Sequence, residues 1–163
     1  MSEPPGYSKT QIALHWVSVG LVALQLVLHN GMANAWDRAQ ATGVFSLSMP
    51  VVVHFVIGGC ILGLTMWRFA VRQEQGVPPP PAAEPEVLKR AGHAAHLGFY
   101  VVLILLPVTG GLAWGMESDA LSKVHEILRL ILVALIFAHI GAVIFHQKVL
   151  RSGLLQRMTR TQD

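Results

Sequence analysis

The stretch SKVHEILRLILVALIFAHIGAVIFH, residues 122–146, decides the fold of this chain. It is almost entirely apolar after its first residues, and it exceeds the ~20 residues that a helix needs to cross a bilayer. His125 and His139 lie 14 residues apart within it. At about 100° and ~1.5 Å per residue, both imidazoles share one helix face and stand ~21 Å apart. The stretch predicts a membrane helix with one histidine near each face of the bilayer.

Three further stretches are long and apolar enough to span: residues 10–31, 50–71 and 93–116. The chain is 53% hydrophobic and only 13% charged. No stretch alternates as a barrel strand does, so helices are the only plausible spanning structure. We therefore predict an all-α membrane protein, a bundle of four transmembrane helices. Little chain remains outside the spans, so residues 1–163 form a single membrane domain.

Two features test this interpretation. Ala33-Asn34-Ala35 resembles a signal-peptide cleavage site, but the preceding apolar run is long and Lys9 is its only positive flank. The first stretch is therefore taken as a retained span. The single cysteine, Cys60, excludes a disulfide framework, a cysteine-ligated iron–sulfur cluster and covalent c-type haem. It is expected to be a small, buried apolar residue.

The basic residues are distributed unevenly between the connections. The first and third connections carry only Arg38 and Lys123, whereas nine basic residues lie in the amino terminus, the second connection and the tail: Lys9, Arg68, Arg72, Lys89, Arg90, Lys148, Arg151, Arg157 and Arg160. By the positive-inside rule both termini are cytoplasmic. The net charge of +3 then favours anionic membrane lipid as a partner and does not indicate nucleic acid.

The connections themselves are unlike one another. Residues 31–49 form an outer loop that could lie partly on the lipid headgroups, and residues 73–92 form an inner loop with a proline spacer, Pro78–Pro81. The connection around residues 117–121 is very short, so the third and fourth spans are antiparallel neighbours. Pro107 predicts a kink in the third span. Four glycines leave room for a flat cofactor or for close helix packing: Gly58, Gly59, Gly110 and Gly111.

The histidines cluster at two depths. His54 and His125 lie about one turn in from the outer face, and His15 and His139 approach a common level near the inner face. Two pairs at two depths are what two haems with two axial imidazoles each require. Zinc and non-haem iron sites need three or four converging ligands, often with a carboxylate, and no carboxylate lies deep in any span. The same absence counts against a proton or cation pathway.

Two arginines accompany these pairs. Arg68 lies 14 residues after His54, so it shares that face at the inner depth and could pair with a haem propionate, or simply snorkel to the membrane surface. Arg129, one turn beyond His125, is the corresponding outer candidate.

The remaining histidines leave alternatives open. His146 could replace His139 as the inner ligand if the fourth helix sat deeper. His93 and His96 begin the third span and could line a propionate or quinone site, or be hydrated interfacial residues. His29, near the outer end of the first span, is interpreted as structural.

Taken together, these motifs resemble the bacterial cytochrome b-561 family. The resemblance covers nearly the whole chain and is carried by residues 7–16 (YSKTQIALHW), His54 with Arg68, His93 and His96 with Pro107-Val108-Thr109-Gly110, and His125-Glu126 followed by His139 and His146. It implies four membrane helices, two haem b groups and electron transfer commonly coupled to quinone. The family's ligand positions correspond to His15, His54, His125 and His139. The very short outer connection departs from some relatives and puts in doubt any donor site built on that loop.

Three functional hypotheses follow. The first is a dihaem, quinone-linked oxidoreductase of the bacterial inner membrane, which moves single electrons between a periplasmic donor and the quinone pool; the resemblance suggests superoxide as one donor. The second is a haem-bearing anchor subunit that relays electrons for a larger redox complex, since cytochrome b subunits of formate dehydrogenases and hydrogenases share the 14-residue histidine spacing. The third is a colourless helical transporter with incidental histidines. A homodimer is possible in each case.

Overall fold

A computed structural model describes residues 6–80 and 84–160. The chain forms six helices in these ranges: α1 (Lys9–Val27), α2 (His29–Thr42), α3 (Met49–Gln75), α4 (Glu86–Gly115), α5 (Asp119–Lys148) and the short α6 (Leu154–Arg157). The described residues contain no strand. The predicted all-α fold is therefore confirmed.

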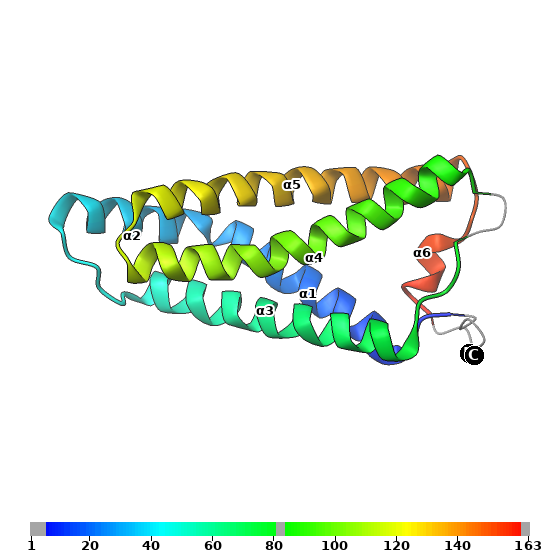
Figure 1. Ribbon diagram of the computed structural model, residues 1–163, viewed down its shortest axis with the longest axis horizontal. Coiled ribbons are helices and arrows are strands. Elements are labelled where there is room, and N and C mark those ends of the chain that lie inside the picture. Colours follow the sequence, from blue (N-terminus) through cyan, green and yellow to red (C-terminus); the bar gives the residue numbers. More distant parts are fainter. Residues whose placement is uncertain (1–5, 81–83, 161–163) are drawn as a thin grey trace.

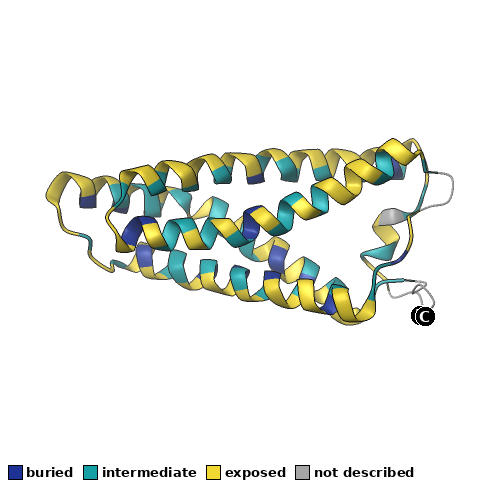
Figure 2. Cartoon of the chain, in the orientation of Figure 1, coloured by how far each residue is buried: buried dark blue, intermediate teal, exposed yellow. Residues whose placement is uncertain are grey.

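Four of the helices, α1, α3, α4 and α5, are long and apolar enough to cross a membrane. Most of their surface faces outward, as the exposed positions along each ribbon in Figure 2 show. Large apolar side chains lie on that surface, with Val27 77% and Phe137 72% exposed. An apolar surface of this extent is stable in lipid and not in water, so the four helices fit a membrane bundle.

The long helices pack in a definite order (Figure 1). The closely packed pairs are α1 with α3, α3 with α4 and α4 with α5. Among the described residues, the backbone of α5 does not approach that of α1 or α3 closely. Buried apolar side chains fill the middle of the bundle: Ile57, Ile61, Val102, Leu103 and Leu132. Because the described backbone of α5 stays away from that of α1 and α3, only side chains extend across the space between them. This space continues from the apolar layer toward both ends of the bundle.

Helix boundaries follow local capping chemistry. Ser8 and Gln11 form a capping box at the start of α1, and the Ser118 hydroxyl accepts a hydrogen bond from the Leu121 amide at the start of α5. Between α4 and α5 the chain turns at Glu117, whose φ is 51°. The connection is as short as the sequence predicted, and α4 and α5 are antiparallel neighbours. Helix α4 continues through Pro107 to Gly115.

The first connection differs from the prediction. The apolar stretch at residues 10–31 is interrupted at Leu28, and α2 occupies most of the expected outer loop. Helix α2 continues beyond the end of α1 (Figure 1), at the end of the bundle where α3 begins and α4 ends, which we call the outer end. There Ala35 and Ala39 belong to one buried cluster with Val51 and Trp114. The small alanine side chains on this face of α2 allow the helix to pack against side chains of α3 and α4. The periodicity of the first apolar stretch could not reveal this packing, because it involves residues of other helices.

The inner end also differs in detail. Helix α3 continues to Gln75 and α4 begins at Glu86, so the inner connection is shorter than residues 73–92. Pro81, the last residue of the proline run, lies outside the described residues. The carboxyl-terminal segment with α6 folds back over this end (Figure 1), where the Trp16 indole N–H donates to the Met158 carbonyl at 2.7 Å.

The interpretation of Cys60 as a buried residue is wrong. Its side chain is exposed on α3. Because the outward face of a membrane helix is itself apolar, an apolar residue in the middle of a span need not face the protein interior.

Candidate functional site

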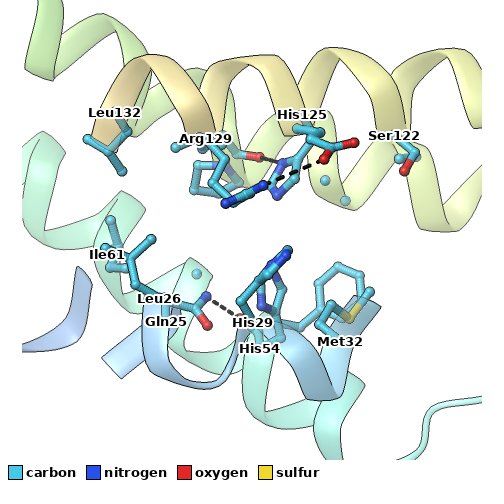
Figure 3. A pocket seen from close by; sticks show the side chains of 18 of the residues that line it. Gln25, Leu26, His29, Met32, His54, Ile61, Ser122, His125, Arg129 and Leu132 are labelled. Atoms are coloured by element: carbon cyan, nitrogen blue, oxygen red, sulfur yellow. Dashed lines mark hydrogen bonds and ion pairs between the residues drawn. The ribbon is translucent and has the colours of Figure 1, made fainter. Parts of the chain in front are cut away.

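His54 of α3 and His125 of α5 face one another near the outer end of the bundle. Figure 3 shows both rings directed into the space between the helices, and their centroids lie 6.2 Å apart. An imidazole nitrogen binds a metal ion at about 2 Å and lies roughly 1 Å from its ring centre, so two rings on opposite sides of one ion are about 6 Å apart. The spacing of the outer pair matches this value.

The His125 ring is held by helix α4. Its Nδ1 lies 2.9 Å from the Leu106 carbonyl oxygen and 3.4 Å from the Thr109 hydroxyl. When Nδ1–H donates to that carbonyl, Nε2 has no proton and is free to bind a metal. The contact fixes both the tautomer and the direction of the ring.

Gly110 makes this approach possible. A Cβ atom at this position would lie 2.9 Å from both Cε1 and Nδ1 of His125, a distance that Cβ atoms essentially never show. Gly111 and Gly59, by contrast, have no atom within 4 Å of a Cβ position and line the outer cavity. Gly58 lies near the side chain of Gln25. Of the four glycines, one accommodates a histidine and two leave open space.

The outer pair lies in a cavity of about 480 Å³, within the range of cofactor pockets. Three buried polar atoms on its walls have no hydrogen-bond partner within the described structure: Gln25 Oε1, His54 Nδ1 and Arg129 Nε. Buried polar atoms are nearly always paired, so such a group in one cavity indicates a ligand with polar substituents. The cavity therefore fits a largely apolar cofactor that carries polar substituents and is bound between two imidazoles.

Sequence reasoning missed two residues of this cavity. Gln25 donates from Nε2 to the His54 carbonyl at 2.9 Å, and His29, interpreted above as structural, lines the cavity wall (Figure 3). A signal for His29 was present, because it lies 14 residues after His15, the spacing that also separates His125 and His139. No comparable pattern distinguished Gln25.

His15 of α1 and His139 of α5 form a second facing pair at the inner end. Their ring centroids are 6.5 Å apart, close to the outer value. Two more rings surround His139, those of His96 at 5.9 Å and Phe99 at 5.6 Å. The guanidinium Nη2 of Arg68 lies 3.3 Å from His15 Nδ1. The inner end therefore brings together three histidines and an arginine.

A small cavity of about 40 Å³ flanks this cluster, and its size suits water or a small polar group. His15 and His139 are not on its walls, which are formed by Tyr7, Gln11, Leu14, Arg68, Arg72, Val77, His96, Tyr100 and Met158. Burial raises the pKa of the Tyr7 phenol above its usual value. Tyr7 therefore keeps its proton at neutral pH and can act as a hydrogen-bond donor there.

The other two inner histidines lie elsewhere. His146 Nε2 lies 3.2 Å from a carboxylate oxygen of Glu84, and its ring also approaches the Ser152 hydroxyl. His93 is exposed and is not on the wall of the inner cavity. The structure thus places His96 beside the inner pair, and it places His146 and His93 apart from it.

Comparisons with known proteins agree with this architecture. The family model described as prokaryotic cytochrome b561 matches residues 6–161. The chain is 32% identical over 160 residues to cytochrome b562 of Cereibacter sphaeroides, with 98% of this chain and 99% of that protein covered.

Two further relatives are more distant. Cytochrome b561 homolog 1 of Escherichia coli strain K12 is 27% identical, with 93% of this chain and 96% of the relative covered. A protein of Yersinia pestis named probable superoxide oxidase is also 27% identical, with 93% of this chain and 94% of the relative covered. The family match over nearly the whole chain shows that this protein belongs to the prokaryotic cytochrome b561 family of haem-binding membrane electron-transfer proteins.

Proposed function

We propose that this protein binds two haem b groups and moves single electrons from a periplasmic donor to the quinone pool. His54 and His125 would hold the outer haem through their imidazoles, and His15 and His139 would hold the inner haem. The observation that carries this proposal is the pair of facing imidazoles at each end, 6.2 Å and 6.5 Å apart, between helices whose backbones do not pack closely.

The haem supplies one-electron chemistry when bound, and the protein determines which reactions it can undergo. If both imidazoles of a pair held the haem, it would supply one-electron transfer without direct binding of a substrate. The Leu106 carbonyl keeps His125 in the tautomer that can bind through Nε2. A buried apolar layer in the middle of the bundle lies between the two pairs.

Arginines at both ends provide partners for carboxylate side chains of the cofactor. Arg129 lines the outer cavity, and its Nε has no hydrogen-bond partner among the described residues. Arg68 already contacts one of the proposed haem ligands. Because a guanidinium can only donate hydrogen bonds, His15 Nδ1 accepts from Arg68 and His15 Nε2 carries the proton. Binding of His15 to iron therefore requires Arg68 to release His15, and a propionate oxygen is a suitable new acceptor.

Orientation follows from the basic residues. The inner pair lies at the end of the bundle that carries the amino terminus and the tail, and this end faces the cytoplasm because most basic residues of the connections lie there. Superoxide is a candidate donor because a relative is named probable superoxide oxidase. His96, beside the inner pair, is a candidate for a quinone or propionate contact.

The ligand assignment is tested by haem content. We expect purified protein to hold two haem groups per chain, both extracted by acid–acetone. His54→Ala and His125→Ala should each lose the outer haem, and His15→Ala and His139→Ala the inner one, because a single axial imidazole holds a porphyrin weakly. His146→Ala is the matched control and should keep both. Loss of haem from His146→Ala with retention in His139→Ala would contradict the inner assignment.

The donor and acceptor are tested separately. Protein in detergent or vesicles is supplied with a superoxide source and a ubiquinone analogue, and haem reduction and quinol formation are followed by absorbance. We expect quinol formation that depends on both pairs. Activity that requires a co-purifying soluble subunit would instead favour the anchor hypothesis.

A further inference from the structure

The two cavities differ in the charges that line them. The outer cavity is lined by one guanidinium, that of Arg129, and by two carboxylates, those of Asp37 and Glu126. The inner cavity is lined by two guanidinium groups, those of Arg68 and Arg72, and by no carboxylate. The small cavity that flanks the inner pair therefore carries a net positive charge on its walls, and the cavity that holds the outer pair does not.

Ion pairs increase this difference. Arg129 Nη2 lies 3.5 Å from a carboxylate oxygen of Glu126, so an anionic partner lies beside this guanidinium. At the inner end, Glu84 is paired with His146. Arg68 has no carboxylate within ion-pair distance among the described residues and lies against His15 instead. An unbalanced cation thus lies next to an inner axial ligand and has no counterpart at the outer pair.

An unbalanced positive charge favours the reduced form of a nearby haem, because reduction adds one negative charge to the site. The attraction is strong where water is excluded, since the effective dielectric constant there is far below that of water. Net charge around the iron is one of the means by which proteins set haem potentials. A propionate bound to Arg68 would balance one positive charge at the inner end. Arg72 lines the same cavity and has no carboxylate within ion-pair distance among the described residues, so a positive charge would remain there.

We propose that Arg68 and Arg72 raise the reduction potential of the inner haem above that of the outer haem, so that electrons run from the outer site to the inner one. This inference rests on the proposed function. In the step itself one electron leaves the reduced outer haem and reduces the oxidised inner haem. No bond forms or breaks, and no proton is required.

The test is a spectroelectrochemical titration of the holoprotein. Because His54→Ala should hold only the inner haem, its midpoint potential identifies the inner value in the two-haem protein. We expect the inner potential to be the higher one. Arg68→Gln should lower the midpoint potential of the inner haem relative to that of the outer haem by at least 59 mV. For a one-electron couple this is a tenfold shift of the electron distribution toward the outer haem. Arg72→Gln should act in the same direction, and Arg68→Lys should retain most of the inner potential.

Arg90→Gln is the matched control, since Arg90 is exposed on α4 and is not on the wall of either cavity. It should leave both potentials nearly unchanged. An inner potential below the outer one would overturn the inference, as would equal shifts in Arg68→Gln and Arg90→Gln. These results are distinct from failure of the proposed function, which would appear as a haem content other than two before any potential is measured.

Discussion

Replacement of Gly110 by alanine tests whether close contact with α4 positions His125. The new Cβ would lie 2.9 Å from two ring atoms, whereas ordinary contact begins near 3.4 Å, so the ring must move by about 0.5 Å. That movement lengthens the 2.9 Å contact between Nδ1 and the Leu106 carbonyl toward the limit of a hydrogen bond. The ring then loses the contact that fixes its tautomer.

The magnitude follows from opposing effects. Overpacking costs roughly 1–3 kcal/mol and the lost hydrogen bond about 1 kcal/mol, whereas alanine gains about 1 kcal/mol over glycine as a helix former. Only the first two effects act on His125, so we expect outer haem binding to weaken by about 2–4 kcal/mol, roughly thirtyfold to a thousandfold. Protein stability without haem should change much less.

The assay is haem titration into protein that has been stripped of cofactor, followed by absorbance, with thermal unfolding measured in parallel. Gly115→Ala is the matched control, because it lies on the same helix and its Cβ would meet no atom within 4 Å. Equal haem affinity in Gly110→Ala and Gly115→Ala would refute the role assigned to this contact.

Two further predictions concern the inner end. His146→Ala should lower the free energy of unfolding by about 1–3 kcal/mol, because it leaves the Glu84 carboxylate without its partner, and both haems should remain; unchanged thermal stability would show that the pair contributes nothing. Reporter fusions at Asp163 should be active only in the cytoplasm, as the distribution of basic residues requires, and fusions active only in the periplasm would reverse the orientation.

Much of the architecture could be predicted from the sequence alone. Length and hydropathy indicate membrane helices because the bilayer sets the length of a span. The 14-residue spacing of His125 and His139 places both on one face at two depths, since the helical period fixes angle and height along a single helix. The same calculation placed Arg68 at the inner depth, and the structure has it 3.3 Å from His15.

Other features depended on how the helices are rotated against one another. The period of α4 gives no reason for Gly110 to differ from Gly111, and only the position of α5 brings His125 against Gly110. His146 lies near the face of His139, yet a carboxylate from the inner connection pairs with it. The break at Leu28 ends α1 before the predicted residue 31, and the α2 that follows it packs against α3. Periodicity describes one helix at a time, whereas these contacts join residues from different helices, so only the tertiary structure decides them.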